Sequence, residues 1–194
     1  MKIQELRSES RFRKIAKTLN RNLIKQYLNL GYHFHPVHKG EGGYGSIMQH
    51  DDLPYVIKLF DVEDTAYVKF IQLARSHHSN PHFPKFRGQV VKLSDQVQAI
   101  RLEKLMPWSK ASYEDMEYLL YQAQSDPDWR RHLDRNPIAQ EFMQTWPQFG
   151  QALDVLNKFI MQGGHEITFD WHDGNIMQRS DGTPVIIDPF APVA

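Results

Sequence analysis

The chain has 194 residues, of which 41% are hydrophobic and 24% charged, and its formal net charge is zero. This length suits one larger domain or two small lobes. The balanced charge gives no general affinity for nucleic acid or membrane, and the absence of cysteine excludes disulfides, thiolate metal sites and cysteine nucleophiles. The polar N-terminus and the lack of a run of about 18 apolar residues predict a cytoplasmic protein without a membrane span.

Residues 1–30 are predicted to contain a basic amphipathic helix. Between residues 11 and 28, apolar side chains recur on one face at helical spacing and basic side chains lie opposite. The segment carries eight Lys or Arg against two Glu, and Gly31 is expected to end the helix. The basic face is interpreted as a solvated surface. The alternative is that this face docks an acidic partner. Nucleic acid is a less favoured ligand for it.

A glycine-rich segment comes next, with its glycines at Gly40, Gly42, Gly43 and Gly45. Together with Ile47 it fills every position of G-x-G-x-x-G-x-V, with Ile for Val. Glycine allows the sharp turn and lets backbone N–H groups approach phosphate oxygens. Strand-like segments at 46–48 and 55–60 follow, which disfavours a dinucleotide-binding turn, and no Gly-Lys-Ser/Thr follows, which excludes a P-loop. Lys58 lies at an inward position of the second strand.

In the middle of the chain, apolar residues at helical spacing predict a helix over 61–77, and Asp61 could cap its start. Two strands are predicted at 86–91 and 96–102. Residues 111–162 are expected to be mainly helical, with a break at 125–128, a helix start at Asn136-Pro137 and one helix through the apolar residues from 138 to 160. Gly163-Gly164 is expected to end that helix.

The C-terminal stretch carries the strongest chemical pattern. Asp170 and Asn175 are five residues apart around a turn at Gly174, and an apolar hairpin over a turn at 180–183 returns the chain to Asp188. A hairpin brings its two ends together, so Asn175 and Asp188 are expected to face one space beside Asp170. Their oxygens suit Mg²⁺, which is usually held by one or two carboxylates and substrate phosphates. A purely structural role as turn and capping residues is the alternative.

Taken in order, these motifs resemble the protein-kinase-like superfamily over about residues 37 to 190. The segment Tyr55-Val56-Ile57-Lys58 is similar to the strand that carries the characteristic lysine of that family. The sequence Asp-Trp-His-Asp-Gly-Asn at 170–175 is closer to the catalytic loop of small-molecule and atypical bacterial kinases than to that of eukaryotic ones. The resemblance implies an α+β, two-lobed fold with a small antiparallel β N-lobe and a reduced helical C-lobe. The expected domains are the basic helix at 1–30, the N-lobe at 31–106 and the C-lobe at 107–194.

The resemblance also implies that the protein binds ATP with Mg²⁺. Lys58 and the loop glycines would bind the phosphates, and Asn175 and Asp188 would hold the metal ion. Asp170 would orient or deprotonate the acceptor hydroxyl. Ile47, Val56 and Met106 would flank the adenine, whose edge would meet the main chain from Glu103 to Leu105.

Several features depart from the family pattern. The helix after the strand lysine has acids only near its start, at Asp61, Glu63 and Asp64, so the usual partner of the lysine is displaced. Thr168-Phe169 replaces the His-Arg of eukaryotic protein kinases, and Pro189-Phe190 follows Asp188. Only six residues follow Asp188, so an activation segment and the later helices are expected to be absent. This resembles the pared-down kinases of bacterial effectors and phages.

The predicted function is an ATP- and Mg²⁺-dependent phosphotransferase acting on a hydroxyl, first of a protein Ser or Thr and second of a small molecule. The alternative is a catalytically weak kinase-fold module that recruits or inhibits a protein partner. A metal-dependent hydrolase built on Asp170, His172 and Asp173 is a third interpretation, which leaves the glycine loop unexplained.

Overall fold

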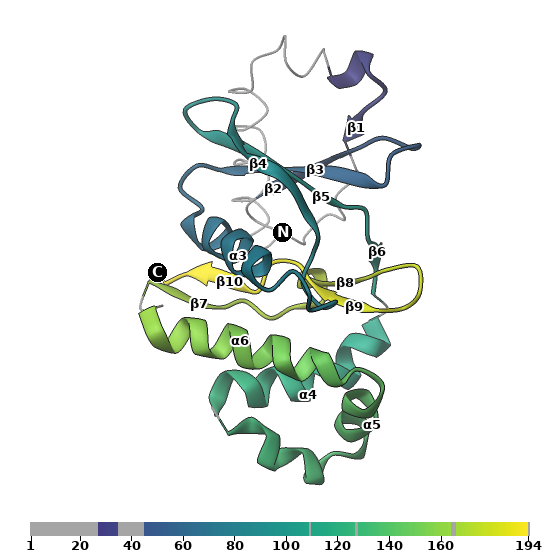
Figure 1. Ribbon diagram of the computed structural model, residues 1–194, viewed down its shortest axis with the longest axis vertical. Helices are drawn as coiled ribbons and strands as arrows, with labels where there is room; N and C mark the ends of the chain where they lie inside the picture. Colours follow the sequence, from purple (N-terminus) through teal and green to yellow (C-terminus); the bar gives the residue numbers. More distant parts are fainter. Residues whose placement is uncertain (1–26, 35–44, 109, 127, 164–165, 194) are drawn as a thin grey trace, which may run out of the picture. The chain divides into compact units, whose positions relative to one another are not determined.

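The computed structural model describes residues 27–34, 45–108, 110–126, 128–163 and 166–193. The chain divides into two compact units, Met1–Thr65 with Lys85–Lys104 and Ala66–Pro84 with Leu105–Ala194. The first unit contains an antiparallel sheet, and the second contains most of the helices and two small sheets (Figure 1). The predicted α+β class is therefore confirmed. Most of the predicted basic helix, and the glycines at 40, 42 and 43, lie outside the described residues.

The first unit is built on a five-stranded antiparallel sheet with strand order β1-β2-β3-β5-β4. The strands are β1 (His33–Phe34), β2 (Gly45–Gln49), β3 (Tyr55–Asp61), β4 (Phe86–Lys92) and β5 (Val97–Glu103). One face of the sheet carries a core cluster that includes Met48, Ile57 and Leu59. The four strands predicted at 46–48, 55–60, 86–91 and 96–102 are confirmed, with ends that differ by one residue.

Gly31 ends a helix, as predicted, in the part of that helix that the structure describes. Gly31 has a φ of 85°. The Tyr32 N–H donates to the Tyr27 carbonyl at 3.0 Å, and the Gly31 N–H donates to the Leu28 carbonyl at 3.1 Å. These two bonds form a Schellman motif, in which a left-handed residue after the helix satisfies its last carbonyls. A Cβ at Gly31 would also come within 2.7 Å of the His50 ring, so the position requires glycine.

The helix after β3 begins later than predicted. Helix α3 spans Thr65–Ser76, and Asp61 belongs to β3 instead of capping the helix. The Asp61 carboxylate accepts the Glu63 N–H at 2.9 Å, and its carbonyl accepts the Asp64 N–H at 3.1 Å. This local turn competes with the helix and delays its start. Glu63 and Asp64 therefore precede α3, which contains no acidic residue.

The second unit contains the helical region predicted between 111 and 162. Its elements are α4 (Lys110–Ser125), the 3₁₀ helix η1 (Trp129–Arg135), α5 (Pro137–Thr145) and α6 (Pro147–Gly163). Asn136 caps α5 by accepting the Ala139 N–H at 3.1 Å, which confirms the predicted start. The single helix expected through 138–160 is wrong. Pro147 lacks an N–H and restricts the residue before it, so the chain forms two helices.

Short strands form the C-terminal part of the second unit. Two strands, β7 (Ile167–Phe169) and β10 (Phe190–Pro192), form one sheet, and β6 (Met106–Pro107), β8 (Ile176–Gln178) and β9 (Pro184–Ile186) form another. The predicted hairpin is confirmed, because β8 pairs with β9 across a turn in which Gly182 has a φ of 85°. Across the described ranges, no helix has both the length and the apolar character needed to cross a membrane.

Candidate functional site

The structure brings Asp170, Asn175 and the segment around Asp188 together through three hydrogen bonds in the second unit. The Asn175 side-chain N–H donates to the Asp170 carbonyl at 2.7 Å. The Asp170 N–H donates to the Pro189 carbonyl, and the Ile187 N–H donates to the Asn175 carbonyl, each at 2.9 Å. The last two bonds are made by the residues on either side of Asp188. They fix its backbone between those of the other two predicted site residues.

The turn between Asp170 and Asn175 is made by a histidine cap. The 3₁₀ helix η2 spans Asp173–Asn175, and the His172 Nδ1 accepts the Gly174 N–H at 3.1 Å. The predicted turn is therefore present, but Gly174 does not have a positive φ. Because Nδ1 accepts, the proton of the neutral ring is on Nε2. Nε2 lies 3.9 Å from the Asp170 carboxylate, too far for a direct hydrogen bond, and that carboxylate is 45% exposed.

The hydrogen bond of Asn175 fixes the orientation of its buried amide. The nitrogen must face the Asp170 carbonyl, because two oxygens in that position would repel each other. The amide oxygen consequently points away from that carbonyl and is available to a cation. One amide oxygen and the carboxylate of Asp188 suit Mg²⁺ when phosphate oxygens and water complete its coordination. The residues present thus fit this metal ion.

A second kind of metal centre receives no support. Within the ranges that the structure describes, no group of three or more His, Asp or Glu side chains is arranged to hold a metal ion. A hydrolase centre on Asp170, His172 and Asp173 would need such a group. The site therefore offers a carboxylate, an amide oxygen and a second carboxylate, without a preformed metal cage.

Packed aromatic rings support both ends of this site. Phe169, just before Asp170, stacks on Trp171 with ring centroids 5.1 Å apart. Phe190, just after Pro189, stacks on Phe159 at 5.6 Å and meets Phe70 edge-on at 6.1 Å. Phe70 and Phe190 are buried. Hydrogen bonds among the residues of the polar site therefore hold it together. Packed rings at Phe169 and at Phe190 support the chain where it enters and leaves the site.

A buried histidine anchors the hairpin, and the sequence analysis missed it. His82 donates from Nδ1 to the Pro184 carbonyl at 2.8 Å, and its own carbonyl accepts the Ile186 N–H at 2.9 Å. Burial lowers the pKa of His82, the hydrogen bond to Pro184 opposes this shift, and the charge of Arg179 lowers the pKa further. The Arg179 guanidinium also donates to the carbonyls of Pro81 and Phe83. Pro184 is 102 residues from His82 along the chain, so no local sequence pattern indicated this contact.

The first unit contains most of the other predicted site residues that the structure describes, whereas Leu105 belongs to the second unit. Ile47 lies directly opposite Lys58 in the β2–β3 pair, and Val56 is two residues from Lys58 along β3. Since side chains alternate along a strand and paired residues share a face, all three lie on the same face of the sheet. Gly45, the last glycine of the predicted loop, begins β2.

The main chain from Glu103 to Leu105 is partly occupied. The Glu103 N–H donates to the Lys85 carbonyl at 3.1 Å, and the Lys104 N–H donates to the Pro54 carbonyl at 3.0 Å. The N–H groups of Glu103 and Lys104, within the main chain predicted to meet the adenine edge, therefore already have protein acceptors. The Leu105 N–H has no hydrogen bond to any other residue in the described chain.

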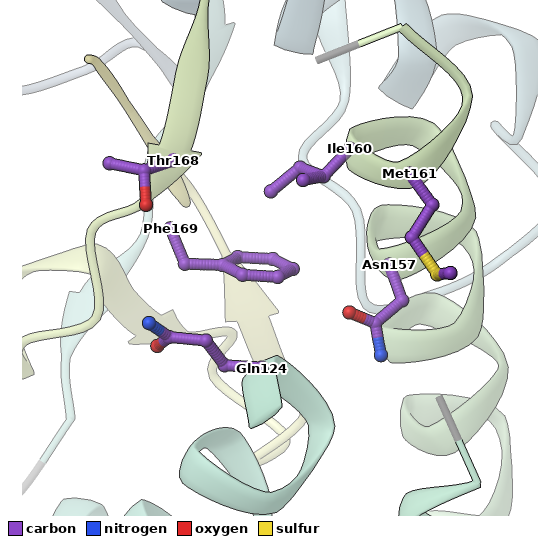
Figure 2. Close-up of a pocket in the computed structure, with 6 residues that line it drawn as sticks. All are labelled: Gln124, Asn157, Ile160, Met161, Thr168 and Phe169. Atoms are coloured by element: carbon purple, nitrogen blue, oxygen red, sulfur yellow. The ribbon is translucent and has the colours of Figure 1, made fainter. Parts of the chain in front are cut away.

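A separate cavity of about 310 Å³ lies in the second unit (Figure 2). It is lined by Gln124 from α4, by Asn157, Ile160 and Met161 from α6, and by Thr168 and Phe169 from β7. The Phe169 ring extends between Gln124 and the α6 side chains in this view (Figure 2). None of the predicted site residues lines the cavity, although Phe169 directly precedes Asp170.

The chain matches no protein-family model and no curated protein sequence. The class that the fold defines is α+β, with an antiparallel sheet in one unit and a helical second unit. The function must therefore be argued from the residues of the site.

Proposed function

We propose that the protein is an ATP- and Mg²⁺-dependent phosphotransferase with a two-lobed, protein-kinase-like fold, and that it transfers the γ-phosphate to a protein Ser or Thr hydroxyl. The observation that carries the proposal is the closed set of hydrogen bonds that joins Asp170, Asn175 and the residues flanking Asp188. It combines one exposed carboxylate with two oxygen donors of the type that Mg²⁺ prefers. Catalysis of this kind depends mainly on positioning and on electrostatic stabilisation.

The three residues of the second unit take different roles in the proposal. Asp170 is held through its main chain, so its half-exposed carboxylate is free to orient the acceptor hydroxyl and accept its proton. Asn175 and Asp188 hold Mg²⁺, which neutralises phosphate charge when it is bound. The acceptor oxygen bonds to the γ-phosphorus, the bond from that phosphorus to the bridging oxygen breaks, and ADP leaves.

Residues of the first unit, together with Leu105 of the second, bind the nucleotide in this proposal. Lys58 binds the phosphates, together with Gly45 and the glycines at 40, 42 and 43. Ile47 and Val56, which share a face with Lys58, flank the adenine. The Leu105 N–H donates to its edge.

A second candidate is a kinase-fold module that binds nucleotide and recruits or inhibits a protein partner without transfer. One observation favours it. Helix α3 has no acidic residue, whereas the helix after the strand lysine supplies a Glu to that lysine in the kinase family. Helix α3 therefore does not supply the acid that this helix contributes in the kinase family, which is a departure from the pattern of an active kinase.

Transfer from γ-labelled ATP with Mg²⁺, with and without a cell extract, tests the proposal. We expect Asp170→Ala to reduce transfer about 10²–10⁴-fold and to keep ATP affinity, measured by calorimetry. Asp173→Ala is the matched control, because it removes a carboxylate of similar exposure from the same loop. If the label appears on a small molecule and not on a protein, the proposed acceptor, a protein Ser or Thr hydroxyl, is wrong and the acceptor is a small-molecule hydroxyl.

Two outcomes would contradict the proposal. ATP binding by the wild-type protein without any transfer would support the recruiting module. A failure to bind ATP would overturn the roles of Lys58 and the glycine segment in both candidates.

A further inference from the structure

Two arginines converge on one tyrosine in the sheet of the first unit, where β3, β5 and β4 are neighbours (Figure 1). Arg87 on β4 lies directly opposite Arg101 on β5. The guanidinium carbons of Arg87 and Arg101 lie 5.9 and 5.7 Å from the centroid of the Tyr55 ring on β3. Both arginines are exposed. We call Tyr55, Arg87 and Arg101 the arginine–tyrosine cluster.

The nearest acid in the register is Glu103, which lies directly opposite Tyr55 on β5 and accepts the Lys85 N–H at 2.8 Å. Like charges directly opposite each other on antiparallel strands repel. Neither Arg87 nor Arg101 forms an ion pair with a carboxylate of any residue that the structure describes. Attraction to the tyrosine ring offsets part of this repulsion and restricts both guanidinium groups. Arg101 also donates a hydrogen bond to the Tyr55 hydroxyl, and since each guanidinium carries five N–H groups, others are left to donate to a ligand.

The backbone of β4 makes room for this arrangement. Gly88 follows Arg87, has a φ of 70°, and lies where the register between β4 and β5 shifts. A Cβ at position 88 would come within 3.1 Å of an Arg101 guanidinium nitrogen. Gly88 therefore permits both the irregular strand and the observed position of Arg101.

The Tyr55 hydroxyl adds a third polar group. It accepts a hydrogen bond from the Tyr32 hydroxyl at 3.1 Å, so its own hydrogen is left to donate to another acceptor. The hydrogen bond from Tyr32 lowers the pKa of Tyr55, burial opposes this shift, and a hydrogen bond from Arg101 and the charges of Arg101 and Arg87 lower the pKa further. Burial and the same hydrogen bond raise the pKa of Tyr32 to about 12. Tyr55 is thus the more acidic and better donor of the two.

We propose that the arginine–tyrosine cluster is a binding site for a dianionic phosphate group, separate from the proposed phosphotransfer. Two guanidinium groups match the geometry of phosphate oxygens, and their two charges balance a dianion. The Tyr55 hydroxyl donates to a further oxygen. A carboxylate carries a single charge and is expected to bind more weakly. The phosphate can belong to a phosphorylated protein side chain or to a free phosphate, since the chemistry is the same.

Titration of the 194-residue chain, followed by NMR of the arginine Nε–H signals, tests this site. The probes are inorganic phosphate, a phosphoserine peptide, and the same peptide with Ser or Glu in place of phosphoserine. We expect saturable shifts of the Arg87 and Arg101 signals with both phosphate probes, and weaker or no shifts with the Glu and Ser peptides. Exposed Arg135 on η1 should not respond, which controls for general screening.

Four variants make the test specific. Arg101→Gln and Arg101→Lys should each weaken phosphate binding about tenfold, the latter because Lys keeps the charge but lacks the planar fork. Gly88→Ala should weaken binding by displacing the Arg101 guanidinium. Arg135→Gln removes the same charge elsewhere and should keep the affinity, and thermal melting verifies that each variant folds.

The outcomes separate the two sources of phosphate. Tighter binding of the phosphoserine peptide supports the site with a phosphorylated protein as its ligand, and equal binding of inorganic phosphate supports it with a free phosphate. No saturable shift with either phosphate probe overturns the proposal, as does equal binding of the Ser peptide or unchanged affinity in Arg101→Gln. Loss of phosphotransfer in the Asp170 variant has no bearing on this result.

Discussion

The sheet face around Lys58 and the C-terminal loop around Asp170 hold their predicted site residues in different ways. In the sheet, Ile47, Val56 and Lys58 share a face because backbone pairing and strand alternation put them there. In the loop, the Asn175 side chain donates a hydrogen bond to the Asp170 carbonyl, and buried Phe70 and Phe190 pack beside the segment that follows Asp188. A substitution in the sheet should therefore change mainly the chemistry, whereas one in the loop should also change the geometry.

Phe70 provides the strongest test of this difference. It is fully buried and packs near Phe83 and Phe190, so Phe70→Ala should lower the free energy of unfolding by about 3–5 kcal/mol. Urea denaturation measures this loss, and hydrogen exchange should be faster at the amides of Asp170 and Ile187. Phe70→Leu, which keeps most of the volume, should cost under about 1.5 kcal/mol. A loss below about 1 kcal/mol in Phe70→Ala would show that the rings do not support the loop.

Asn175 tests the loop itself. Asn175→Ala removes the donor to the Asp170 carbonyl, and we expect a loss of about 1–3 kcal/mol because that group is then unsatisfied. Gln178→Ala is the matched control. Its amide also donates to a main-chain carbonyl, that of Pro107 at 3.0 Å, but it is exposed, so the loss should be within about 0.5 kcal/mol. Equal losses in chemical denaturation would remove the distinction between the buried and exposed amides.

His82 makes the stability of the second unit depend on pH. Burial lowers its pKa in the folded protein, so below about pH 6.5 the unfolded chain binds more protons than the folded one. Its contribution is complete above pH 6.5 and is lost as the pH falls toward the lowered pKa. Urea denaturation at pH 7.5 and 5.5 should show this decrease, and His82→Gln should reduce it. His78→Gln, at an exposed position, should leave the decrease unchanged.

Gly182 has the smallest expected effect. It has a φ of 85°, and no atom lies within 4 Å of an added Cβ, so Gly182→Ala should cost only the backbone penalty of about 1–2 kcal/mol. Gly182→Asn should cost less, because Asn tolerates the left-handed region better. Thermal unfolding of the two variants checks this order. A larger loss in Gly182→Asn would contradict a purely conformational origin.

Local pattern predicted much of the fold. Short strand-like segments indicated four strands of the first sheet, Gly31 and Asn136 marked helix ends, and the 180–183 turn marked the hairpin. Errors arose where two local preferences compete. The Asp61 turn delays α3, and Pro147 divides the predicted long helix. The roles of the glycines at 40, 42 and 43 stay predictions.

The sequence by itself determined which residues could form strands, turns and helix ends, because these depend on backbone preferences over a few neighbouring positions. It also indicated that Asn175 and Asp188 lie at the two ends of one hairpin. Only the tertiary structure decided that His82 is buried against β9, that rings flank the polar loop, and that Arg87 and Arg101 meet at Tyr55. These features depend on contacts between residues far apart in the sequence, and burial and electrostatic environment are properties of such contacts.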